Sequence, residues 1–154
     1  MLSSECIQFC NRNNWAKSAI STIRAAVEHA RICESGYLGN EHLLLALLST
    51  ENRATSLVDL CNSGAAGSIV NYLTENKIKN SDPLTAPAAD ELDLTPSAMR
   101  IVTGANALPA NFVDCEHILI SFLLDNDSYG HSILAQHGIT YDVVIENAKT
   151  IVSE

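Results

Sequence analysis

An acid followed by a histidine opens two apolar segments of this chain. The stretch GNEHLLLALL spans residues 39–48, and DCEHILISFLL spans residues 114–124. A carboxylate in the first turn of a helix lies beside unpaired backbone N–H groups and the positive end of the helix dipole. Glu41 and Glu116 could therefore stabilise the helix start, or hold a guanidinium group while the N–H groups hold a phosphate. The histidine after each glutamate is expected to bond a neighbouring loop and fix the helix.

No other motif in the sequence predicts catalysis or cofactor binding. The sequence contains neither a G-x-x-x-x-G-K-[ST] phosphate loop nor a G-x-S-x-G nucleophile turn. The cysteines include no C-x-x-C pair, and their odd number predicts free thiols in a reducing compartment. They are Cys6, Cys10, Cys33, Cys61 and Cys115. We therefore expect no metal, no cofactor and no enzymatic activity in this chain.

The charge balance favours a protein partner. Nine Lys and Arg face 18 Asp and Glu, a formal net charge of −9, which disfavours nucleic-acid binding and suits a basic partner. No apolar run approaches the roughly 20 residues that a membrane helix needs. The start of the chain lacks a basic segment followed by an apolar one. The expected location is cytoplasmic, or an organelle stroma if a targeting peptide has been removed.

Hydrophobic periodicity predicts short helices throughout the chain. In the first half we expect helices over residues 15–34, 40–49, 56–63 and 68–75. Asn40 is the predicted N-cap of the second of these, and Gly64 is predicted to follow the end of the third. Further on, Thr95 is a predicted N-cap, with Pro96 at the first helical position.

An internal repeat organises these elements. The two Glu-His pairs align at an offset of 75 residues, and the apolar residues after them match in turn. We predict an all-α fold of about eight helices, arranged as two pseudo-twofold four-helix repeats that pack together. The predicted segments are an N-terminal extension, repeat 1, a linker and repeat 2. They cover residues 1–14, 15–75, 76–94 and 95–152.

These motifs resemble the Clp N-terminal domain, a double Clp-N repeat. The resemblance rests on GNEHLLLALL followed by LTPSAMR and CEHILISFLL, and it covers roughly residues 15–152. Such domains precede the Clp AAA+ unfoldases and also occur in small accessory proteins of Clp proteases. The chain departs from the family where Gly39-Asn40 and Asp114-Cys115 replace the usual Gly-Thr. The first helix of the second repeat is also expected to be about one turn shorter than its counterpart.

The resemblance implies a protein-recognition domain that docks adaptors or substrates for a Clp unfoldase–protease. In some relatives the equivalent glutamates bind phosphoarginine as a degradation tag, which would place pockets at Asn40/Glu41 and Cys115/Glu116. The alternative is a stand-alone accessory subunit that binds the Clp protease ring or its motor and tunes assembly. The expected partners are therefore Clp ATPase or protease components, adaptors and protein substrates.

Two aromatic residues are further candidates for partner contact. Tyr37 and Phe112 lie in matching loops just before the Glu-His helices, and we expect both to be half-exposed. Their neighbours Leu38 and Val113 are expected to be buried.

Overall fold

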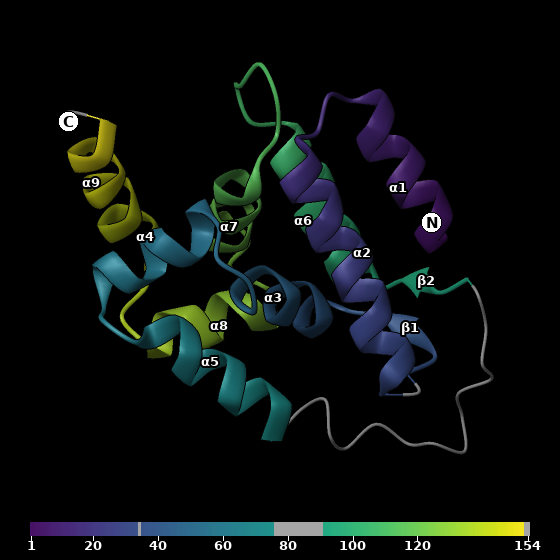
Figure 1. Cartoon of the computed structure of the whole chain (residues 1–154), viewed down its shortest axis with the longest axis horizontal. Helices are drawn as coiled ribbons and strands as arrows, with labels where there is room; N and C mark the ends of the chain where they lie inside the picture. The colour runs from purple at the N-terminus through teal and green to yellow at the C-terminus, as the bar shows by residue number, and fades with distance from the viewer. Residues whose placement is uncertain (34, 76–90, 153–154) are drawn as a thin grey trace.

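The computed structural model in Figure 1 describes residues 1–33, 35–75 and 91–152. Within these ranges the chain forms nine helices and two strands of two residues each. The helices are α1 Ser3–Arg12, α2 Lys17–Ile32, α3 Asn40–Leu48, α4 Arg53–Cys61, α5 Ala65–Leu73, α6 Pro96–Asn106, α7 Cys115–Leu124, α8 Tyr129–Gln136 and α9 Tyr141–Val152. The strands are β1 Tyr37–Leu38 and β2 Asp93–Leu94. The predicted all-α class is confirmed, and α1 accounts for the helix beyond the expected eight.

The two predicted repeats correspond to α2–α5 and α6–α9, and their helices interlock. Within each repeat the long first helix packs against the Glu-His helix, α2 on α3 and α6 on α7. Other helices cross over, so that α4 packs against α7 and α9 while α8 packs against α3. One repeat alone would leave these apolar faces in water, which explains why the two are built as one unit.

Short backbone pairings hold the two repeats together. β1 and β2 are parallel, with Leu38 opposite Leu94, and an isolated parallel bridge joins Trp15 to Val113. The segment before each Glu-His helix is thus paired with the segment before the first helix of the other repeat. The start of α6 thereby lies beside α3, and the start of α2 lies beside α7.

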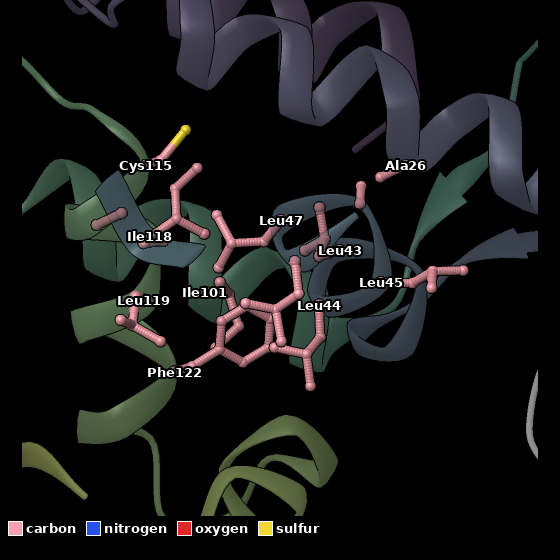
Figure 2. Close-up of a cluster of buried hydrophobic side chains, with 14 of the residues drawn as sticks. Ala26, Leu43, Leu44, Leu45, Leu47, Ile101, Cys115, Ile118, Leu119 and Phe122 are labelled. Atoms are coloured by element: carbon pink, nitrogen blue, oxygen red, sulfur yellow. The ribbon is translucent and has the colours of Figure 1, made fainter. Parts of the chain in front are cut away.

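The Glu-His helices form the centre of the core. Every residue of α3 is buried except Glu41, and six of the ten residues of α7 are buried, as expected for helices that are largely apolar. Figure 2 shows side chains of both helices meeting around the Phe122 ring, with Ile101 of α6 among them. Complete burial of one leucine or phenylalanine stabilises the fold by about 1.5–3 kcal/mol. This core fixes the starts of α3 and α7 on a rigid base.

Residues of the expected N-terminal extension and of the end of the expected linker also pack against the core. Cys6 and Cys10 of α1 are fully buried, and the Ser3 N–H donates to the Leu92 carbonyl at 2.8 Å. Leu92 and Leu94, at the end of the expected linker, are buried in and beside β2. The rest of that linker, residues 76–90, lies outside the described residues. The boundaries between extension, repeats and linker stay predictions.

Several helix ends differ from expectation. Gly39, not Asn40, is the N-cap of α3, because the Asn40 side chain turns into the interior. Gly64 was expected just after the end of α4, but it is the N-cap of α5, with a φ of 80°. α5 therefore begins at Ala65, three residues earlier than the predicted start at residue 68. The Thr95 N-cap is confirmed, since its side chain accepts from the Ala98 N–H at 3.1 Å.

The relative lengths of the long helices agree with the sequence. α6 has 11 residues against 16 in α2, so the predicted shortening is confirmed. Among the described helices, none combines the length and hydrophobicity required to span a bilayer.

Candidate recognition site at the two helix tips

The histidine of each Glu-His pair caps its own helix. The Gly39 N–H donates to His42 Nδ1 at 3.0 Å, and the Asp114 N–H donates to His117 Nδ1 at 2.9 Å. In both cases the third helical residue reaches back to the N-cap backbone, which is the return half of a capping box. Burial lowers the pKa of His42, which favours the neutral ring that this hydrogen bond requires. The histidines are therefore structural, as expected, although they bond the N-cap N–H and not a loop carbonyl.

We call the start of α3, with Tyr37, Gly39, Asn40 and Glu41, the first tip. The Glu41 carboxylate folds back over Gly39, where an added Cβ would lie 2.8 Å from each carboxylate oxygen. The Tyr37 ring meets the His42 ring edge-on, with 5.8 Å between their centres. Partial burial, followed by the nearby Glu41 carboxylate, raises the pKa of Tyr37. The first tip thus combines a carboxylate, a tyrosine hydroxyl and a helix start that no N-cap side chain covers.

The side chain of Asn40 lies in the protein interior and not on the surface of this tip. Its side chain is 3% exposed, and its Oδ1 accepts a hydrogen bond from the Gly130 N–H at 2.6 Å. Its Nδ2 has no partner among the described residues. Asn40 can therefore meet an external ligand only through its backbone, and its side chain fastens α3 to α8.

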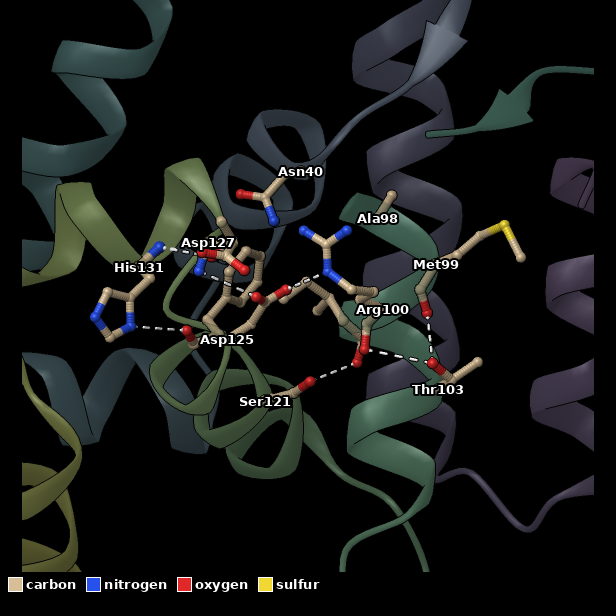
Figure 3. Close-up of polar contacts among 12 residues, drawn as sticks. Asn40, Ala98, Met99, Arg100, Thr103, Ser121, Asp125, Asp127 and His131 are labelled. Carbon is tan, nitrogen blue, oxygen red and sulfur yellow. Dashed lines mark hydrogen bonds and ion pairs between the residues drawn. The ribbon is translucent and has the colours of Figure 1, made fainter. Parts of the chain in front are cut away.

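The turn between α7 and α8 is fixed by a further set of polar contacts, which Figure 3 shows beside Asn40. Arg100 Nε donates to Asp125 Oδ2 at 3.0 Å, and Asp125 Oδ1 accepts from the Asp127 N–H at 3.2 Å. His131 lies inside α8 and is half-buried, with Nδ1 3.2 Å from the Phe122 carbonyl. These contacts hold Gly130 against the first tip.

We call the start of α7, with Phe112, Asp114, Cys115 and Glu116, the second tip. Here Asp114 is a true N-cap, because its Oδ1 accepts from the Cys115 N–H at 2.7 Å and from Ser18 Oγ at 2.5 Å. Burial by itself would raise the pKa of Asp114. The hydrogen bonds from Ser18 and Cys115, helped by the charge of Arg53, hold that pKa below its usual value.

Cys115 contributes a buried thiol to the second tip. Its side chain is almost fully buried, and its Sγ lies 3.5 Å from Thr22 Oγ1. Burial raises the pKa of this thiol, which keeps it neutral. The side chain belongs to the packing between α2 and α7.

Glu116 has a neighbour that the sequence did not suggest. Arg53 Nη1, at the start of α4, lies 3.6 Å from Glu116 Oε1. No motif marks Arg53, which follows the polar turn after α3, and only the crossing of α4 over α7 brings it to this carboxylate. The equivalent first residue of α8 is Tyr129, so the first tip has no arginine at this position.

Both aromatic candidates are exposed where expected. Tyr37 and Phe112 are each 47% exposed, whereas Leu38 and Val113 are buried. Each aromatic ring stands within a few residues of a tip glutamate. Among the described residues, no three His, Cys, Asp or Glu side chains gather in a way that could hold a metal ion.

The comparison with protein families decides the family of this chain. The Clp repeat (R) N-terminal domain matches residues 14–137, which include α2 to α8. The chain belongs to the Clp N-terminal domain family. No curated protein matched the chain in the corresponding search. In this Clp N domain, α1 and α9 lie outside the matched residues.

A solved structure supports the fold of this Clp N domain. The N-terminal domain of Hsp104 from Candida albicans matches with a TM-score of 0.68 and 23% sequence identity. The match covers 85% of this chain and 86% of that chain. At this identity, the similarity supports a shared fold only. Clp N-terminal domains are non-catalytic and bind substrates or adaptors for Clp ATPases.

Proposed function

We propose that this Clp N domain docks adaptors or protein substrates for a Clp unfoldase–protease through its two helix tips. The observation that carries the proposal is that both buried helices begin with a glutamate and follow a loop with an exposed aromatic ring, and that at the first tip the Tyr37 ring lies close enough to the Glu41 carboxylate to feel its charge. Glu41 follows Tyr37 and Glu116 follows Phe112 at the same spacing of four residues, and both rings are exposed. A carboxylate beside an apolar ring suits a basic side chain with an apolar neighbour.

Rigid support for the tips favours recognition. Each tip is held by a histidine hydrogen bond and by pairing with the other repeat, so a partner would meet a surface that is already formed. Binding to a preorganised surface costs less conformational entropy than binding to a loop that must first be ordered. The net charge of −9 would further attract a basic partner.

A phosphoarginine tag is the finer form of this proposal, and we assign it to the first tip. Glu41 would hold the guanidinium group, while backbone N–H groups at the start of α3 would hold the phosphate. Gly39 supports this assignment because it has no side chain of its own, and the Glu41 carboxylate that lies over it would turn toward the guanidinium group when the tag binds. At the second tip the Asp114 carboxylate already accepts from Cys115, which opposes a phosphate there.

The experiment is capture of partners from native cell extract by the tagged chain. The variants are Glu41→Gln, Glu116→Gln and the double variant, with Glu28→Gln on the exposed face of α2 as the matched control. We expect the wild type and the control to retain an adaptor or a set of substrates that the double variant loses. If every form captures only the Clp ring or its motor, the chain is an accessory subunit and the proposal is wrong.

A further inference from the structure

A pocket of about 870 Å³ lies beside the second tip. It opens where α4 runs past the start of α7 and reaches Ala148 of α9. Its lining combines charged groups of both signs, Glu51, Arg53 and Glu116, with apolar surface from Leu57 and Ala148. A pocket of this size has room for a long side chain of a bound protein.

One carboxylate oxygen of Glu116, a residue that lines this pocket, lacks a partner among the described residues. Glu116 Oε2 is buried and forms no hydrogen bond among the described residues, while Oε1 has Arg53 at 3.6 Å. The Glu116 side chain is only 16% exposed, whereas that of Arg53 is 72% exposed. A buried ionised oxygen without a donor is costly, so a further cationic donor would be favourable there. Arg53 faces solvent and can be displaced at small cost.

The surrounding charge selects the sign of the ligand. Glu51, Asp114 and Glu116 outnumber Arg53 around the pocket mouth. Asp114 also accepts the hydrogen bond from the Cys115 N–H, a group that an uncapped helix start would offer to an anion. These carboxylates would therefore repel a phosphate at this tip, whereas they would attract a cation that carries no phosphate.

We propose that the second tip binds the unmodified guanidinium group of an arginine on the docked protein. The guanidinium donates to Glu116 Oε2, the aliphatic stem lies against Leu57 and Ala148, and Arg53 moves aside. Guanidinium suits the site because its planar fork can engage a carboxylate through two N–H groups. This inference rests on the proposed function, since a docked protein must present the arginine. The two tips would then bind different groups: phosphoarginine at the first tip and unmodified arginine at the second.

The test isolates the second tip in a Glu41→Gln background. The probes are fluorescein-labelled, alanine-rich peptides that differ at one position: arginine, lysine, the neutral isostere citrulline, or phosphoarginine. Fluorescence anisotropy should show the arginine peptide binding at least about tenfold more tightly than the citrulline peptide, as for a charged hydrogen-bonded pair. Adding Glu116→Gln should remove that preference. Tighter binding of phosphoarginine than of arginine in the Glu41→Gln background would overturn the inference.

Arg53 provides a second, independent variant. Because it competes for Glu116, Arg53→Ser should tighten binding of the arginine peptide severalfold and leave the thermal unfolding midpoint nearly unchanged. Weaker binding would show that Arg53 holds an anionic part of the ligand, and the inference would be wrong. The two proposals can fail separately. If capture from extract depends on Glu41 but peptide affinity does not change with Glu116→Gln, only this inference is rejected. Full retention of adaptors or substrates by the Glu41→Gln, Glu116→Gln double variant would reject the proposed function itself.

Discussion

The side-chain oxygen of Asn40 accepts a hydrogen bond from the backbone N–H of Gly130 at 2.6 Å. This bond links the start of α3 in one repeat to the first turn of α8 in the other. It is buried, whereas the bond from Asn62 Nδ2 to the His137 carbonyl at 2.8 Å, which also joins the two repeats, is exposed. The buried bond ties the first tip to the rest of the domain.

Asn40→Ala should destabilise the fold by about 1–3 kcal/mol, because the buried Gly130 N–H would lose its acceptor. Asn62→Ala is the matched control, since it removes an exposed bond between the same repeats and should change stability by less than about 0.5 kcal/mol. Urea unfolding followed by circular dichroism measures both. Equal effects of the two substitutions would show that the buried bond is not special.

Gly130→Ala should destabilise the fold, whereas Gly67→Ala should stabilise it. A Cβ at Gly130 would lie 2.5 Å from the Phe122 ring and 2.7 Å from Asn40 Oδ1, so overpacking should cost about 1–3 kcal/mol. A Cβ at Gly67, inside α5, would meet nothing within 4 Å, and alanine there should stabilise the helix by about 0.5–1 kcal/mol. Thermal unfolding midpoints should shift down and up respectively. A midpoint that rises for Gly130→Ala would contradict the close packing of α8 on this region.

Stability should fall as the pH drops below about 6.5, in part because of His42. Burial, opposed by Glu41 and assisted by His29, lowers the pKa of His42 from its usual 6.5. The unfolded chain then binds more protons than the folded one just below that pH, so protonation favours unfolding. The protonated ring also loses the hydrogen bond from Gly39.

The variant His42→Gln tests this contribution, since glutamine can accept from the Gly39 N–H but does not titrate. The free energy of unfolding should decline less between about pH 7 and about pH 5 in the variant than in the wild type. His29 is present in both proteins, so the difference between the two slopes isolates His42. Parallel slopes would mean that His42 titrates alike in the folded and unfolded chains.

Truncation of the exposed aromatic rings should weaken partner capture and leave the fold intact. The double variant Tyr37→Ala, Phe112→Ala removes apolar surface beside both tips, and half-exposed rings at an interface centre often contribute 2 kcal/mol or more, roughly a thirtyfold loss of affinity. Leu60→Ala is the control, because Leu60 is similarly exposed at 54% but lies on α4 and belongs to neither tip. Pull-down from native extract measures the loss. An equal loss in the control would remove the case for a site at the tips.

Much of the fold follows from local patterns. The apolar runs after Glu41 and Glu116 predicted buried helices, and Thr95 followed by Pro96 predicted the start of α6. Helix starts depend on contacts within three or four residues, which a sequence displays directly. The repeated Glu-His segments likewise predicted two packed copies. The N-cap of α3 was misjudged because Asn40 is a good cap in isolation, and its burial against Gly130 outweighs that preference.

The sequence by itself determined the all-α class, the internal repeat and the exposure of Tyr37 and Phe112. Only the tertiary structure decided that Arg53 meets Glu116, since these residues are 63 positions apart and join where α4 crosses α7. It likewise decided that α1 buries Cys6 and Cys10. The physical reason is that helix periodicity and capping are local, whereas the pairing of charges and faces depends on how the two repeats interlock. That interlocking buries apolar faces of both repeats together, and no short stretch of sequence encodes it.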